Sequence, residues 1–192
     1  MTPFIESTRL LLTPMGTLVL EALLQNDRIA AGRLLGCRIP PDLPLMDLPL
    51  ARRLGQLRVD PAVEPWLLRA IIERTSGTMI GRIGFHSPPQ PDDLADIAPD
   101  GVELGYGVYS PFRRQGYARE AALALMHWAY AQHDQRCFVL SVSPQNLAST
   151  AMAESLGFTR CGSQMDDEDG LELFFVRRFG NWPEDWCVEA SG

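Results

Sequence analysis

The sequence predicts an α/β protein built on one mixed sheet of about seven strands, with helices on both faces. Three observations carry this prediction. Strand-like and helix-like segments alternate through the second half of the chain, as in a sheet covered by helices. A hairpin-like pair of apolar segments lies in the first half, which adds antiparallel strands. No apolar run reaches the roughly 18 residues that a membrane helix needs.

The first half is expected to contain a strand within residues 6–12, then a helical region and then a hairpin. The hairpin consists of Arg69–Arg74 and Met79–Phe85, joined by the turn sequence Thr75–Thr78. Before the hairpin, residues 36–65 hold six prolines among Leu, Met and Val, which makes the segment too apolar for a disordered linker. Long loops inside compact domains are usually functional. Short helical turns are expected in this segment, near Leu50–Leu57 and Pro61–Trp66.

The second half begins with two strand–helix pairs. Val102–Tyr109 is rich in Val, Tyr and Leu, and Ala118–Ala131 holds Ala, Leu, Met and Trp almost without a helix breaker. The apolar run Cys137–Val142 is the next strand, and the next helix covers Ala148–Ser155. Gly157 is expected to end that helix in the left-handed conformation.

The chain closes with two further strands, Phe158–Cys161 and Leu171–Arg177, joined by an acidic loop. The loop run Asp166–Asp169 lacks the residue spacing of a calcium loop. His127 and His133 are not four residues apart on their helix, so no metal site is expected.

The segment between the strand 102–109 and its helix predicts an anion site. A strand that turns through a basic, glycine-containing loop into a helix presents backbone N–H groups at the positive end of the helix dipole. Gly116 lets the backbone approach a phosphate, and Arg113, Arg114 and Arg119 supply charge-assisted donors. The sequence has no nucleotide-hydrolase loop and no Rossmann fingerprint, so other phosphate loops fit poorly.

Two motifs carry a family resemblance. The loop resembles the pyrophosphate motif Q/R-x-x-G-x-G/A of the GNAT superfamily of N-acetyltransferases, filled by Arg113, Gly116 and Ala118. Downstream, Asn146-Leu-Ala-Ser149 and Glu154-Ser-Leu-Gly-Phe158 resemble the family's second motif. The N-terminal segment Glu6–Leu12 resembles the T-x-R-L-x-L first strand of the branch that contains ribosomal-protein N-terminal (alanine) acetyltransferases.

The resemblance implies the GNAT acyl-CoA N-acyltransferase fold, with a central twisted mixed sheet, as a single domain over residues 1–192. Residues 32–64 lie outside the family pattern as an acceptor-side insertion, and residues 179–192 form a C-terminal tail. Related acetyltransferases place the insertion over the acceptor groove, although a dimer surface or a flap over the core would explain it equally well. The tail segment Trp182–Trp186 is expected to dock on the domain or on a second subunit.

The resemblance further implies that the chain binds acetyl-CoA as co-substrate. The pyrophosphate is expected on the loop, and the pantetheine arm is expected to contact Asn146 and the backbone at Val108. Asn146 is also a natural N-cap of the following helix, and one amide can serve both purposes. The cofactor loop consists of Arg113, Arg114, Gln115, Gly116, Tyr117, Ala118 and Arg119.

The expected reaction needs a neutral amine, yet only about one lysine-type amine in a thousand is neutral at pH 7. Glu103 is the candidate carboxylate that removes the proton, directly or through water. Glu103, Gly105 and Gly107 share one face of the strand, and the two glycines suggest open space for a substrate channel. The alternative is that Glu103 pairs with a cation on a neighbouring strand. His86 is a second residue that could touch the acceptor.

Ser149 occupies the position from which this branch protonates the leaving thiolate. The alternative is a hydrogen bond from Ser149 to a backbone carbonyl in its own helix. Tyr106 and Tyr109 could line the site, although aromatic residues in strands more often belong to the core.

Bulk properties favour a cytoplasmic enzyme. The formal net charge of −7 argues against duplex nucleic acid as a partner and suits a cationic amine. The four cysteines are scattered without a C-x-x-C pair, as reduced packing thiols are, and no secretory signal is evident.

The expected function is direct transfer of an acetyl group from acetyl-CoA to a primary amine within a ternary complex. The acceptor is a protein N-terminus or a small molecule, and the enzyme could be a homodimer. The alternatives are a non-catalytic acyl-CoA-binding module, or a longer donor such as succinyl-CoA.

Overall fold

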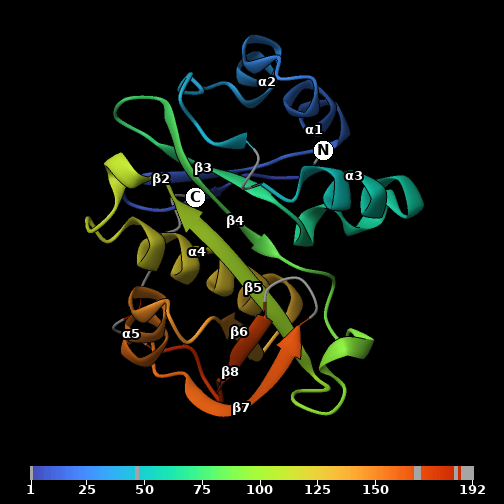
Figure 1. The fold of residues 1–192 in the computed structure, drawn as a ribbon, viewed down its shortest axis with the longest axis vertical. Coiled ribbons are helices and arrows are strands. Elements are labelled where there is room, and N and C mark those ends of the chain that lie inside the picture. Colours follow the sequence, from blue (N-terminus) through green and yellow to red (C-terminus); the bar gives the residue numbers. More distant parts are fainter. Residues whose placement is uncertain (1, 46–47, 167–169, 184–185, 187–192) are drawn as a thin grey trace. The chain divides into compact units, whose positions relative to one another are not determined.

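The computed structural model describes residues 2–45, 48–166, 170–183 and 186, and it confirms the predicted mixed α/β architecture (Figure 1). The chain forms two compact units. The first unit contains the chain up to Gly84 together with Tyr106–Leu125. The second unit contains Phe85–Gly105 and Met126–Cys187.

Four antiparallel strands form the sheet of the first unit. In order they are β1 (Ile5–Glu6), β2 (Leu10–Pro14), β3 (Arg69–Glu73) and β4 (Thr78–Phe85). The hairpin of β3 and β4 confirms the sequence prediction. The expected single strand within residues 6–12 is instead two short strands, because Ser7 turns the chain between them. Its N–H donates to the carbonyl of Leu10 at 2.9 Å, which leaves Thr8 in the turn.

The predicted helical region is two helices, and the proline-rich segment folds as expected. The helical elements of this part are α1 (Thr17–Leu24), α2 (Arg28–Leu35), α3 (Leu50–Val59) and the 3-10 helix η2 (Pro61–Trp66). The helix α2 begins at Asp27, whose carboxylate accepts from the N–H of Ala30, and it ends at Gly36 with φ of +67°. Buried leucines from all three α-helices join Ala70 and Ile72 of β3 in one apolar core.

One strand and one helix run through both units. These are β5 (Gly101–Val108) and α4 (Tyr117–His133), with the 3-10 helix η4 (Ser110–Phe112) between them. A further 3-10 helix, η3 (Asp92–Leu94), precedes β5. The sequence prediction for β5 and α4 is confirmed, and the helix is longer than expected at both ends.

The second unit holds the remaining strands and one helix. They are β6 (Cys137–Val142), α5 (Leu147–Ser155), β7 (Thr159–Asp166) and β8 (Gly170–Arg178). β5 and β6 are parallel, with Glu103 opposite Val139, whereas β8 runs antiparallel to both β6 and β7. The complete eight-stranded order is β1-β2-β3-β4-β5-β6-β8-β7.

Two local predictions for this unit are borne out. Gly157, with φ of +68°, follows α5 in the left-handed conformation. In the tail, the ring of Trp182 lies 5.1 Å from the ring of His127 and 5.0 Å from that of Phe179. The ring of Trp182 therefore packs against side chains of its own chain, which is the first of the two arrangements expected for the tail. Residues 167–169 of the acidic loop lie outside the described residues.

Candidate functional site

The loop from β5 to α4 has the conformation that an anion site needs. Gly116 has φ of +80°, and Arg114 has φ of +61°. The N–H of Glu120 donates to the carbonyl of Gly116 at 3.0 Å and closes the first turn of α4. The N–H groups of the residues between them therefore lie at the positive end of the helix dipole. Because Arg113–Gly116 is exposed, a ligand can reach this loop.

Two of the predicted cofactor-binding residues contact each other. Nε of Arg113 donates to the carbonyl of Val108 at 2.8 Å, so the guanidinium lies against the last residue of β5. The sequence analysis assigned Arg113 to the phosphate and the Val108 backbone to pantetheine. A carbonyl oxygen has two acceptor positions, so a pantetheine arm that pairs with Val108 would share this oxygen with Arg113.

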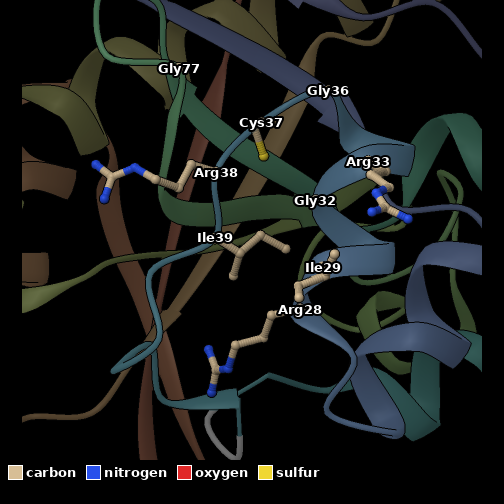
Figure 2. Close-up of a pocket in the computed structure, with 9 residues that line it drawn as sticks. All are labelled: Arg28, Ile29, Gly32, Arg33, Gly36, Cys37, Arg38, Ile39 and Gly77. Atoms are coloured by element: carbon tan, nitrogen blue, oxygen red, sulfur yellow. The ribbon is translucent and has the colours of Figure 1, made fainter.

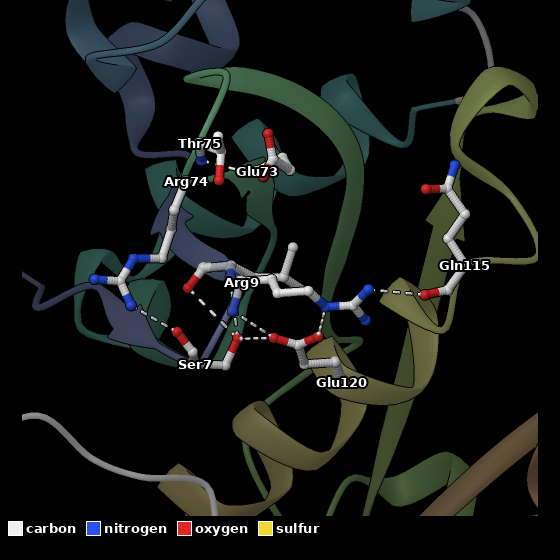
Figure 3. Close-up of polar contacts among 8 residues, drawn as sticks. Ser7, Arg9, Glu73, Arg74, Thr75, Gln115 and Glu120 are labelled. Carbon is white, nitrogen blue, oxygen red and sulfur yellow. Dashed lines mark hydrogen bonds and ion pairs between the residues drawn. The ribbon is translucent and has the colours of Figure 1, made fainter.

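Besides Arg113, Arg114 and Arg119, a fourth cation beside the loop, Arg9, comes from the turn between β1 and β2 (Figure 3). Nη1 of Arg9 donates to the carbonyl of Gln115 at 3.0 Å, and its guanidinium carbon lies 4.4 Å from the centre of the Tyr117 ring. Glu120 holds Arg9 in place, since its carboxylate accepts from both Nε (2.6 Å) and the backbone N–H (2.8 Å) of Arg9. The hydroxyl of Ser7 donates to the same carboxylate at 2.8 Å.

Sequence reasoning missed this role for Arg9. It treated Arg9 only as part of the first-strand motif, and the pairing joins residues 111 positions apart. The signal that could have found it is the acidic residue in the first turn of α4, because Glu120 is favoured there by the helix dipole and needs a cation on its other side. Arg9, Arg113, Arg114 and Arg119 together make the loop surroundings basic in an otherwise acidic protein.

Glu103 lies in the second unit, where it contacts two side chains. One carboxylate oxygen accepts from the hydroxyl of Ser141 on β6, and the other lies 3.2 Å from Nδ1 of His86. The backbone N–H of His86 also donates to the Glu103 carbonyl at 2.9 Å. Glu103 is 7% exposed, so its carboxylate is almost enclosed. The alternative that the sequence leaves open is that Glu103 pairs with a cation on a neighbouring strand. The structure confirms it in part, since the partner is the imidazole of His86, the residue that follows β4.

The structure corrects the expected open space at Gly105. A Cβ at Gly105 would lie 2.5 Å from Nε2 of His86, so the imidazole fills the space that glycine leaves. A Cβ at Gly107 would lie 3.8 Å from Nε of Arg82. That distance is an ordinary contact, and Gly107 lines a cavity, so space remains at this glycine. The contact of His86 with Gly105 is one that alternation along a single strand does not reveal.

The second motif begins a helix as predicted. The side-chain oxygen of Asn146 accepts from the N–H of Ser149 at 3.1 Å, so Asn146 is the N-cap of α5. Among the described residues, the hydroxyl that bonds a carbonyl in this first turn belongs to Thr150, which donates to Asn146, and not to Ser149. Asn146, Ser149 and Glu103 belong to the second unit, whereas Val108 and the cofactor loop belong to the first.

The proline-rich segment lines a cavity of about 460 Å³ within the first unit. Pro40–Pro44 forms one part of its wall, and Gly107–Arg113 forms another. Asp42 and Arg82 contribute opposite charges to the wall. Residues of the insertion and of the end of β5, Val108 among them, thus line the same cavity.

A second cavity, of about 520 Å³, lies at the end of α2 and contains three arginines (Figure 2). Arg28 donates to the carbonyls of Pro40 and Leu43, and Arg38 donates to the hydroxyl of Thr78. Figure 2 shows the side chains of Arg28 and Arg38 pointing in different directions. The hydrogen bonds of Arg28 and Arg38 fix the chain around this cavity, and the two guanidinium groups do not point toward a common position.

The cysteines described are unpaired thiols in different surroundings. Burial raises the pKa of Cys37 to about 11 and that of Cys137 to about 12, so both stay protonated at neutral pH. Cys187 lies outside the described residues. In the part of the chain that the structure covers, no group of three His, Cys, Asp or Glu residues could hold a metal ion. No helix in that part is long and apolar enough to cross a membrane.

Comparison with known proteins gives a family match and many fold relatives. The family described as acetyltransferase (GNAT) domain matches residues 9–159. An uncharacterised N-acetyltransferase of Bacillus subtilis, YjdG, is 27% identical over 88 residues, which are 46% of this chain and 48% of that protein. The chain thus spans about half the length of this curated relative.

Two solved structures illustrate the likeness in fold. A protein described as a GNAT-family acetyltransferase of Bordetella pertussis has a TM-score of 0.64 and 22% identity, over 91% of this chain and 99% of that one. RimL, a ribosomal L7/L12 α-N-protein acetyltransferase solved with coenzyme A, has a TM-score of 0.61 and 20% identity, over 92% and 98% of the two chains. At these identities the likeness concerns the fold alone.

Proposed function

Because the chain belongs to the acetyltransferase (GNAT) domain family, we propose that it is an N-acetyltransferase that moves an acetyl group from acetyl-CoA to a primary amine. The observation that carries the proposal is the loop at Gly116, where left-handed backbone, arginines and a helix N-terminus meet. We further propose that residues 1–192 act as one cytoplasmic domain. A homodimer stays an expectation from the sequence.

The donor is held by residues of this chain that fit a pyrophosphate and a pantetheine arm. The N–H groups at the start of α4 and the guanidinium groups of Arg113, Arg114 and Arg119 bind the pyrophosphate. The backbone at Val108 and the amide of Asn146 bind the arm. When bound, acetyl-CoA supplies a thioester, an acyl group already activated for attack by an amine.

The acceptor amine binds in the cavity lined by Pro40–Pro44 and Gly107–Arg113. One feature supports this placement: the cavity is lined by Val108, whose backbone is proposed to bind the pantetheine arm. This assigns to the insertion the acceptor-side role that its sequence suggests.

The proposed proton transfers use Glu103 and Ser149, the two residues that the sequence suggests. Glu103 takes the proton of the amine, directly or through a water molecule, and Ser149 donates a hydrogen bond to the thiolate as it leaves. The amine attacks the thioester carbonyl directly, so the C–N bond forms as the C–S bond breaks. The hydroxyl of Ser149 suits its role because, among the described residues, no acceptor in its own helix holds it.

A protein N-terminus is the acceptor that the N-terminal motif favours. Thr8 and Arg9 match the first-strand motif of the ribosomal-protein acetyltransferases, and RimL shares the fold. A small-molecule amine with acetyl-CoA, or transfer of a longer acyl group, would use the same donor loop. A non-catalytic acyl-CoA sensor would bind the donor without turnover.

Thermal melting with CoA, acetyl-CoA and succinyl-CoA tests the donor site. A ligand at about one hundred times its dissociation constant adds roughly 2.7 kcal/mol to the stability of the folded protein, which is an easily measured shift. We expect a rise with acetyl-CoA, followed by thiol release when peptides with free N-termini are added. No rise with any donor would reject the loop as a pyrophosphate site, and binding without turnover on any amine would favour the sensor.

A further inference from the structure

We propose that Arg9 is a positioning residue for the binding of acyl-CoA. It orients the peptide group between Gln115 and Gly116 so that the N–H of Gly116 points at the pyrophosphate. This role rests on the donor site proposed above. Arg9 and the loop residues that it contacts all belong to the first unit.

The loop has backbone donors that the protein itself does not use. Among the described residues, the N–H groups of Gly116, Tyr117 and Ala118 donate to no protein acceptor. Such groups at the start of a helix bind an anion when they point toward the same place. The orientation of each peptide group in the loop therefore decides how many donors an anion can use.

Gly116 does not fix the orientation of the preceding peptide group by itself. Rotation of this group changes mainly ψ of Gln115 and φ of Gly116, and glycine adopts φ of either sign at similar cost. A contact from outside the loop can therefore select the observed φ of +80°.

Arg9 makes a contact of this kind (Figure 3). Its Nη1 donates to the carbonyl of Gln115 at 3.0 Å. In a planar trans peptide, the carbonyl oxygen and the N–H of the next residue point in opposite directions. Because the oxygen of Gln115 faces Arg9, the N–H of Gly116 points away from Arg9. Arg9 therefore acts through this N–H and has no contact with the phosphate that the N–H binds.

The guanidinium of Arg9 is itself held in one orientation. Its Nε donates to the carboxylate of Glu120 at 2.6 Å, and its central carbon lies 4.4 Å from the centre of the Tyr117 ring. A guanidinium is planar and its donors have fixed directions, so the bond to Glu120 also sets the direction of Nη1. One side chain thus connects the first turn of α4 to the carbonyl of the loop.

Calorimetry with CoA on variants of Arg9 tests this role. Arg9→Gln should bind CoA about tenfold more weakly, as expected when one hydrogen bond from a charged group is lost. Arg9→Lys should be weakened to a similar degree, because one ammonium group cannot hold both Glu120 and Gln115 as the guanidinium does. Arg58→Gln is the matched control. It removes the same charge from an exposed pair with Glu21 in the same unit, and it should keep the CoA affinity.

Two further ligands show which part of the donor depends on Arg9. Dephospho-CoA keeps the pyrophosphate, so Arg9→Gln should weaken its binding by the same factor as that of CoA. Acetyl-pantetheine has no phosphate, so kcat/KM with this donor should stay unchanged in Arg9→Gln. With acetyl-CoA, the same variant should raise KM and keep kcat. A general loss of folded protein would instead lower the rate with both donors.

Three results would overturn the proposal. Wild-type CoA affinity in Arg9→Gln would show that the contact with Gln115 does not matter for binding. Wild-type affinity in Arg9→Lys would show that a positive charge is sufficient. A loss with CoA that disappears with dephospho-CoA would mean that Arg9 binds the ribose phosphate directly. A wild type that binds neither CoA nor dephospho-CoA would instead reject the proposed donor site.

Discussion

Gly116 is the residue at which backbone conformation has the most direct link to function. Its φ of +80° is one that L side chains rarely adopt, and a Cβ there would lie 3.4 Å from Nη2 of Arg9. The same residue starts α4, at the place proposed for the pyrophosphate. A substitution here therefore affects both the folded backbone and the anion site.

We expect Gly116→Ala to lower the free energy of unfolding by about 1 kcal/mol, the typical cost of a side chain at positive φ, and to weaken CoA binding. Gly116→Asp should weaken CoA binding far more, because it adds a negative charge beside the phosphates. Gly77→Ala is the matched control, since Gly77 has φ of +60° and a Cβ added there would meet no atom within 4 Å. It should lose similar stability and keep its CoA affinity, as measured by melting and calorimetry. Equal CoA affinity in all three variants would contradict the assignment of the Gly116 loop as the pyrophosphate site.

At the scale of elements, the turn between β1 and β2 is tied to the first turn of α4. Glu120 accepts from Ser7 and twice from Arg9, and Arg9 in turn donates to the loop carbonyl of Gln115 (Figure 3). These contacts link the turn between β1 and β2 to the loop that is proposed to bind pyrophosphate. Arg9 of the N-terminal motif therefore contacts the loop at Gln115, although the motif is not part of β5, the strand that precedes this loop.

Glu120→Gln should cost about 1–2 kcal/mol, since hydrogen bonds to a charged group are worth more than neutral ones and Glu120 is partly buried. It should also weaken CoA binding, because Arg9 loses its anchor. Glu21→Gln is a suitable control, as Glu21 pairs with Arg58 at a more exposed site of the same unit. Its stability should change by less than about 0.5 kcal/mol. If Glu120→Gln keeps the wild-type affinity for CoA, the hydrogen bonds of Glu120 do not contribute to binding at the loop.

The cap of α5 allows stability and binding to be separated. Asn146→Ala should cost about 1 kcal/mol, because the N–H of Ser149 loses its acceptor. Asn146→Asp keeps a good cap and removes the amide donor, so it should keep stability while CoA binding weakens. Chemical denaturation and calorimetry on the two variants measure both effects. Wild-type CoA affinity in Asn146→Asp would mean that Asn146 is only a cap.

At the scale of the whole molecule, stability should depend on pH through His127. Burial lowers the pKa of this imidazole, which packs beside Trp182. The unfolded chain, with an ordinary histidine pKa of about 6.5, then binds a proton more readily than the folded protein does. The free energy of unfolding should therefore fall as the pH drops through this ordinary value, and the loss should stop below the folded-state pKa.

Melting curves of the wild type and His127→Gln between pH 8 and pH 5 measure this effect. The substitution should cost some stability at pH 8, where packing alone differs, and the gap between the two proteins should narrow toward pH 5. A gap that stays constant across this range would show that His127 does not contribute to the pH dependence.

The sequence alone determined features that depend on a few neighbouring residues. The strand–loop–helix at Gly116, the cap at Asn146, the left-handed Gly157 and the β3–β4 hairpin all follow from local backbone preferences. Their signals lie within one or two turns of chain, so each can be identified in a single sequence. The family motifs are made of the same local features, which explains why the fold class was predictable.

Only the tertiary structure decided which distant side chains meet. Glu103 and Ser141 are 38 positions apart, and Arg9 and Glu120 are 111 apart. Periodicity along β5 predicts which residues share a face with Glu103, but it does not show that His86 fills the space over Gly105. That contact depends on where β4 ends beside β5, because strand register is set by the packing of the whole sheet. The partners of Glu103, Ser141 and His86, therefore follow from the folded chain and not from the sequence of β5.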